Sequence, residues 1–156
     1  MIFAAIAVIG LILGLFDIAI RKQWTKHRIA EVLLLYFFAF PVGLGGLVGF
    51  LGHTMRAPLV AASIGWPAGN PFQYEVAVAN LAFGILGLLC LRFRDSFWTA
   101  TGIGWSIFLL GAAGVHLNQI RNGQPFAPDN QGAILYFDIL MPVLVLALLT
   151  VRKARK

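Results

Sequence analysis

Five long apolar runs constrain this chain more than any other feature of its sequence. They are residues 2–20, 29–52, 72–91, 97–120 and 132–151. An α-helix needs about 20 apolar residues to cross the hydrocarbon core of a bilayer. The runs do not alternate with a period of two residues, as the strands of a membrane barrel would. The sequence therefore predicts an all-α integral membrane bundle of five transmembrane helices, folded as one domain over residues 1–156.

The composition agrees with a lipid bilayer as the main surrounding of the chain. Only 12% of the residues are charged, whereas soluble domains carry roughly 25%. The net charge of +6 comes from short basic clusters between apolar runs, which argues against a nucleic-acid partner. Cys90 is the single cysteine, so an intramolecular disulfide and a CxxC motif are both excluded.

Lysine and arginine predict the orientation of the bundle. The connections at 21–28 and 92–96 and the tail at 152–156 hold all of them except Arg56 and Arg121. Basic connections stay on the cytoplasmic side of a membrane. We therefore expect the N-terminus outside, the C-terminus in the cytoplasm, and a multi-pass protein of the cell (inner) membrane.

The stretch IGWPAGNPFQYEVAVAN, residues 64–80, leads from a long outer loop into the third span. Asn70 can cap this helix, Pro71 suits its first position, and Gln73 has the spacing of a capping box. The preceding loop at 53–69 is too short to span and predicts an interfacial helix or a lid. Glu75, inside an apolar helix, is costly unless it is paired or used.

Local patterns also predict features of the packing. Pro41 should kink the second span, and Gly45 and Gly49 form a GxxxG pair that favours close helix contact. Asp17 precedes Arg21 by four residues, and Glu31 follows Arg28 by three. Both spacings predict structural ion pairs on one helix face.

Four ionisable residues from four different spans share one depth. His53, Glu75, His116 and Asp138 all lie within roughly 10 Å of the outer boundary, at 1.5 Å per residue. The amides that could support them are Gln73, Asn80, Asn118 and Gln119. Imidazole and carboxylate groups suit Zn, Mn, Fe or Ni, and they also serve proton and cation pathways. The leading hypothesis is a cation- or metal-binding protein, either a transport component or a membrane enzyme.

Other functions stay open on the sequence alone. The same polar residues could form a purely structural network. Short loops and glycine-rich faces fit an accessory or scaffold subunit, in a homo-oligomer or a larger membrane complex. His53 and His116 could in principle ligate haem in a quinone or haem redox module, but no typical haem spacing supports this.

Four segments of the chain also carry a family resemblance. They are IGWPAGNPFQYEVAVANLAFG, the Gly52–His53 pair, GAAGVH before Leu117, and YFDILMP ending at Pro142. In these segments the chain resembles a family of small bacterial integral membrane proteins that carry an IGWPxGxPFQxExxxAN motif and have no assigned function. The resemblance implies a membrane protein of this size and topology, and it implies no activity.

Overall fold

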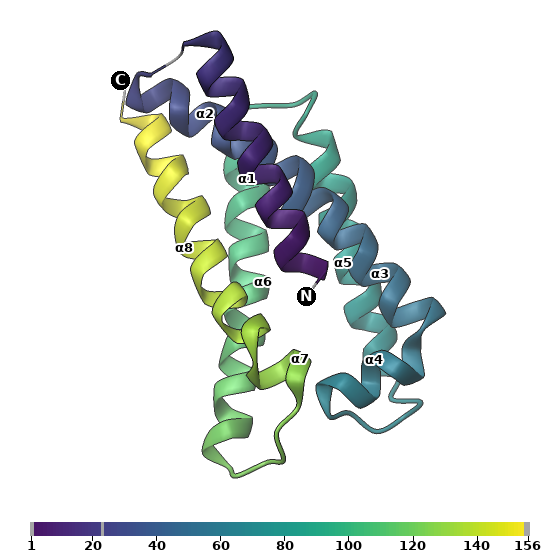
Figure 1. The fold of residues 1–156 in the computed structure, drawn as a ribbon. Coiled ribbons are helices and arrows are strands. Elements are labelled where there is room, and N and C mark those ends of the chain that lie inside the picture. Colours follow the sequence, from purple (N-terminus) through teal and green to yellow (C-terminus); the bar gives the residue numbers. More distant parts are fainter. Residues whose placement is uncertain (1, 23, 155–156) are drawn as a thin grey trace.

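A computed structural model describes residues 2–22 and 24–154, and this part of the chain is helical without strands (Figure 1). The elements of the helix bundle are α1 (Ile2–Arg21), α2 (Lys26–Phe37), η1 (Phe38–Leu44), α3 (Gly45–Met55), α5 (Phe72–Leu89), α6 (Ser96–Arg121) and α8 (Ala133–Lys153). Two short helices, α4 (Ala57–Ile64) and α7 (Pro128–Gln131), belong to the connections. The all-α prediction is confirmed.

Within the described residues, five helical segments are long and apolar enough to cross a membrane. They are Ile2–Arg21, Lys26–Met55, Phe72–Leu89, Ser96–Arg121 and Pro128–Lys153. Their ends differ from those of the predicted runs by only a few residues. Figure 1 shows α3 and α5 along one side, α6 and α8 along the other, and α1 crossing between them.

The kink that Pro41 predicts takes the form of a π-helix. Pro41 has no N–H for the regular ladder, and η1, which contains it, has the wider turn of a π-helix. Such π segments accommodate a missing donor without ending the helix. As a result α2, η1 and α3 form one span from Lys26 to Met55.

Glycines bring α3 and α5 into backbone contact, with a register different from the predicted one. A Cβ added to Gly46 would lie 2.6 Å from the carbonyl oxygen of Asn80 and from the nitrogen of Gly84. A Cβ on Gly87 would lie 2.5 Å from the nitrogen of Gly43. A Cβ on Gly45 would meet no atom of α5 within 4 Å, so the close contact uses Gly46 in place of Gly45, together with the predicted Gly49. In lipid, such contacts stabilise helix pairs through van der Waals packing.

A second helix pair, α6 and α8, packs through one small residue and several large ones. A Cβ added to Gly102 would lie 2.7 Å from a side-chain carbon of Leu149 and 3.1 Å from one of Val145, both on α8. Trp105 contacts Phe37 edge to face, with ring centroids 5.8 Å apart. The large side chains belong to the main hydrophobic core, which therefore lies where α2, η1, α6 and α8 meet.

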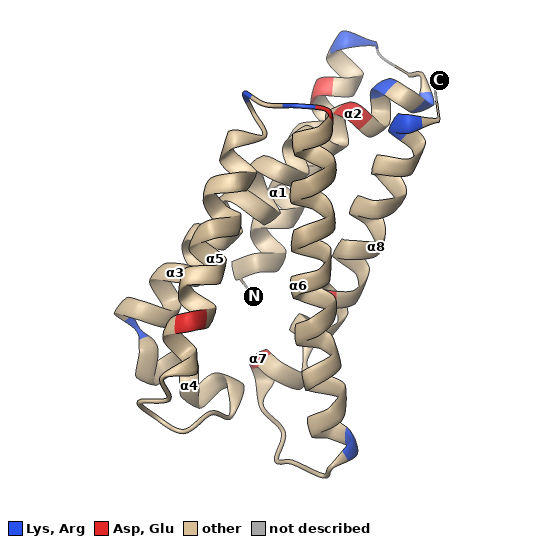
Figure 2. Ribbon diagram, turned by 180° about the vertical axis from the view of Figure 1, so that it is seen from behind, with Lys and Arg blue, Asp and Glu red and all other residues tan. Residues whose placement is uncertain are grey.

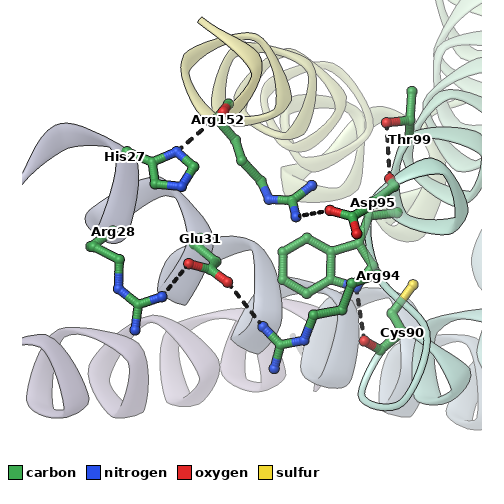
Figure 3. Close-up of polar contacts among 9 residues, drawn as sticks. His27, Arg28, Glu31, Cys90, Arg94, Asp95, Thr99 and Arg152 are labelled. Atoms are coloured by element: carbon green, nitrogen blue, oxygen red, sulfur yellow. Dashed lines mark hydrogen bonds and ion pairs between the residues drawn. The ribbon is translucent and has the colours of Figure 1, made fainter. Parts of the chain in front are cut away.

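Charged residues gather at one end of the molecule, which we call the basic end (Figure 2). Both predicted ion pairs form there, Asp17 with Arg21 and Glu31 with Arg28. Glu31 also pairs with Arg94 of the α5–α6 turn, at 3.2 Å. These contacts fasten α2 to that turn (Figure 3).

Trp98 is the centre of the packing at the basic end. Its Nε1 donates a hydrogen bond to the carbonyl oxygen of Cys90, at 2.8 Å. The guanidinium carbons of Arg94 and Arg152 lie 5.1 Å and 4.8 Å from its ring centre, in cation–π range. Arg152 also pairs with Asp95 at 2.6 Å. The end of α8 is thereby fixed to the α5–α6 turn (Figure 3).

At the opposite end, the predicted interfacial segment is helical. It forms α4, which ends at Gly65 with a left-handed φ of +75°. A Cβ on Gly65 would lie 3.3 Å from Cβ of Ala127, just before α7. Ala61 and Ala127 are both buried. The two connections α4 and α7 therefore close the space between the α3–α5 and α6–α8 pairs at this end.

Candidate functional site

An imidazole and a carboxylate meet inside the α6–α8 helix pair. Nε2 of His116 lies 3.4 Å from Oδ2 of Asp138. Asp138 is only 4% exposed, and the side chain of His116 is 16% exposed. A buried carboxylate needs a partner to offset its desolvation, and His116 is that partner.

The helix periodicity explains why these two residues face each other. His116 lies on the α6 stripe that also contains Gly102, Trp105 and Leu109, and Gly102 and Trp105 of this stripe are buried. On α8, the buried stripe is Leu135, Asp138, Pro142, Val145 and Leu149. Each polar residue therefore continues an apolar face that is already turned toward the other helix.

The pair has polar capacity that its two members do not use on each other. Nδ1 of His116 is buried and has no hydrogen-bond partner among the described residues. Pro142 has no N–H to donate to the backbone carbonyl of Asp138, four residues earlier. The His116–Asp138 pair therefore includes one ring nitrogen without a hydrogen-bond partner in the described chain and one backbone carbonyl without its usual helical donor.

A further polar contact ties α7 to α6 one turn from the pair. The amide of Asn130, which is 3% exposed, donates a hydrogen bond to Oε1 of Gln119. The sequence predicts Gln119 as a supporting residue of the site, and in the structure it binds α7, the connection between α6 and α8. Asn130 is absent from the predicted set, although its position beside Pro128 and before Gly132 marks the turn that leads into α8.

Glu75 is not part of this pair. It is exposed on α5 and makes no ion pair with another described residue. The buried side chains of α5 are Gln73, Ala77, Gly84 and Gly87. Glu75 lies off this face, so equal depth in the membrane does not bring it to His116 and Asp138.

His53 lies apart from the His116–Asp138 pair, in a pocket at the junction of α3, α4 and α5. The pocket has a volume of about 350 Å³ and is also lined by Thr54, Asn70 and Tyr74. Nδ1 of His53 is buried without a hydrogen-bond partner in the described chain. His53 and His116 thus belong to separate helix pairs, which gives the haem alternative no support.

The other amides predicted to support the site, Gln73, Asn80 and Asn118, form no side-chain hydrogen bond with the His116–Asp138 pair. Gln73 is 3% exposed and donates to the carbonyl oxygen of Ala57 at 2.8 Å, so it holds α4 and does not complete a capping box. Asn70 does accept a hydrogen bond at the start of α5, from the N–H of Phe72 at 3.0 Å. Asn80 donates to the carbonyl of Val76 at 2.9 Å, and Asn118 is exposed.

These positions bear on the predicted metal site. In residues 2–22 and 24–154, no three His, Cys, Asp or Glu side chains form a group that could hold a metal ion. A structural zinc site takes four protein ligands and a catalytic one takes three. His116 and Asp138 supply two donors, one fewer than a catalytic zinc site takes from its protein.

The chain matches one family over its whole length. The model of the family of unknown function DUF6790 matches residues 1–156, and the chain belongs to this family. No curated protein and no solved structure matches it.

Proposed function

We propose that this member of the family is a multi-pass protein of the cell membrane whose His116–Asp138 pair takes up and releases a proton. The observation that carries the proposal is the 3.4 Å approach of Nε2 of His116 to Oδ2 of Asp138 within two membrane-spanning helices. Ionisable side chains inside a membrane are costly, and they commonly mark proton and ion pathways.

The chemistry of the pair suits one exchangeable proton. When both groups are charged, imidazolium and carboxylate neutralise each other. When the proton transfers to the carboxylate, both groups are neutral. Neither of these two arrangements carries a net charge. An additional proton from outside would give a neutral acid beside an imidazolium, with a net charge of +1, and release of that proton would restore the neutral pair.

The position of the pair supports exchange with one side of the membrane. His116 is five residues from the end of α6 at Arg121, and Asp138 is five from the start of α8 at Ala133, about 8 Å in each case. Toward the basic end, Trp105, Val145 and Leu149 fill the same interface. If the basic end is cytoplasmic, as the positive-inside rule predicts, the pair exchanges protons with the outside.

A pH titration of histidine nitrogens tests the proposal. The protein, labelled with ¹⁵N-histidine in lipid nanodiscs, is followed by NMR from about pH 4 to 9, the range that histidine samples. We expect the His116 signal to titrate, and Asp138→Asn to change its curve. His53→Gln is the matched control and should leave the curve unchanged.

Two results would count against proton binding. A His116 signal that is constant over this range, in the wild type and in Asp138→Asn, makes the pair a fixed structural contact. A signal that broadens only when Zn²⁺ is added, with no pH response, instead supports the divalent-metal alternative, in which this imidazole and carboxylate are two of the ligands.

A further inference from the structure

An apolar cavity of about 190 Å³ lies between α1 and α8. Its floor is formed by Leu33, Phe37 and Pro41. The α1 wall is formed by Ala4, Ala7, Val8, Gly10 and Leu11, and the α8 wall by Phe137, Met141, Leu144 and Leu148. A dry cavity of roughly 150 Å³ already accommodates benzene, so this one has room for a hydrocarbon group.

The cavity is elongated along α8. Its α8 wall runs from Phe137 to Leu148, which is about 16 Å of helix. At one end, the rings of Phe3 and Phe137 lie 6.5 Å apart and close the gap between α1 and α8. At the other end, Leu148 is five residues, or about 8 Å, before Lys153. A long narrow cavity along α8 fits an alkyl chain better than a compact ring system.

Three lysines lie at the basic end, beyond the lining of the cavity; on α2, Leu33 is seven residues, or about 10 Å, from Lys26. Lys22 follows the last residue of α1, Lys26 is the first residue of α2, and Lys153 is the last residue of α8. The contact of His27 Nδ1 with the carbonyl oxygen of Arg152, at 3.1 Å, places the start of α2 beside the end of α8.

These lysines carry charge that the chain itself does not neutralise. All three are exposed and make no ion pair with any described residue. The neighbouring arginines differ, because Arg21 pairs with Asp17 and Arg152 with Asp95. Positive charge without an ion-pair partner therefore lies at the basic end, where α1 ends and the start of α2 meets the end of α8.

We infer that the α1–α8 cavity and these lysines together bind one anionic phospholipid. An acyl chain occupies the cavity and the phosphate lies among the ammonium groups of Lys22, Lys26 and Lys153. Basic residues at a membrane surface favour anionic headgroups, and the apolar lining from α1, α2, η1 and α8 favours a hydrocarbon chain. A zwitterionic headgroup would bring its own cation toward the lysines and bind more weakly.

Native mass spectrometry in mild detergent tests this inference. The purified protein is incubated with phosphatidylglycerol or with phosphatidylcholine of identical acyl chains, and lipid retention is compared. We expect one tightly retained phosphatidylglycerol per chain and little phosphatidylcholine. A triple variant, Lys22→Gln with Lys26→Gln and Lys153→Gln, should bind phosphatidylglycerol about 100-fold more weakly, because each basic residue near an anionic membrane surface strengthens binding several-fold.

Two further variants separate the cavity from the charge. Ala7→Phe and Leu144→Trp fill the cavity from opposite walls and should each abolish retention, although the lysines are intact; circular dichroism confirms that each variant is folded. Arg56→Gln with Arg121→Gln removes basic residues away from the basic end and should retain the lipid as the wild type does.

Three outcomes would overturn the inference. Equal retention of the two lipids removes the role of the lysines. Retention of phosphatidylglycerol by both folded cavity variants removes the role of the cavity. Equal loss in the Arg56 and Arg121 control would mean that binding follows total charge and not this site.

Discussion

The contact between His116 and Asp138 is a single interaction on which the local packing depends strongly. Removing one partner of a buried pair leaves an uncompensated charge, at a cost of about 3–5 kcal/mol. We therefore expect His116→Ala to lower the thermal unfolding temperature in detergent markedly. The double variant His116→Gln with Asp138→Asn should lose less stability than the single variants His116→Gln and Asp138→Asn lose in sum, because its two amides can still form a hydrogen bond.

Exposed Glu75 provides the control for these single and double variants. Glu75→Gln alters a carboxylate on the free face of α5, and we expect an unfolding temperature close to that of the wild type. Strict additivity of the His116 and Asp138 variants would mean that the two side chains do not interact, contrary to the 3.4 Å geometry.

At the scale of helix pairs, the glycines of α3 and α5 determine how closely the two helices approach. Gly46→Ala should destabilise the protein, because the new Cβ would meet backbone atoms of α5 at 2.6 Å; overpacking of this kind typically costs about 1–3 kcal/mol. Gly111→Ala is the matched control, since no atom lies within 4 Å of its Cβ position. Equal melting temperatures for the two variants would show that α3 and α5 are farther apart.

Trp98 is predicted to control access to Cys90 in the turn between α5 and α6. Cys90 is completely buried, and its carbonyl accepts the indole hydrogen bond. Trp98→Ala should raise the rate at which a maleimide alkylates Cys90 by at least about tenfold, equivalent to roughly 1.4 kcal/mol of easier opening. Trp24→Ala removes an exposed tryptophan near the same end and should leave the rate unchanged; equal acceleration in both would argue against this packing.

For the whole molecule, we expect α4 and α7 to connect the α3–α5 and α6–α8 pairs at the end opposite the basic end. In a Cys90→Ala background, Gly65→Cys with Ala127→Cys should form a disulfide under mild oxidation, because the two Cβ positions lie 3.3 Å apart, close to the separation of disulfide-bonded residues. Gly69→Cys with Ala127→Cys is the control, since Gly69 has open space around it. A cross-link in the control alone would place α7 elsewhere.

The broad architecture could be predicted from the sequence because length and hydropathy alone determine a membrane span. The consequence of Pro41 could be predicted only in part. A missing N–H requires a local change, but whether the helix bends or widens into a π turn depends on what packs against it. The contact of Arg152 with Trp98 was not predictable, because it joins segments that are far apart in the chain.

The candidate site could be predicted in part for a related reason. Residue spacing gives the depth of a side chain in the membrane at 1.5 Å per residue, but the direction in which it points depends on how each helix is rotated. His116 and Asp138 continue apolar stripes, and both face the partner helix. Glu75 lies off the stripe of Gln73, Ala77 and Gly84, a pattern in the sequence that already separates it from the buried face.

The most direct test of the central claim is an infrared difference spectrum of the protein in nanodiscs between about pH 5 and pH 9, within the working range of histidine. We predict a carboxylic acid C=O band that changes together with imidazole ring bands, and that is absent in Asp138→Asn. Glu75→Gln should preserve this band. A spectrum in which Asp138→Asn and the wild type are identical would contradict proton exchange at the His116–Asp138 pair.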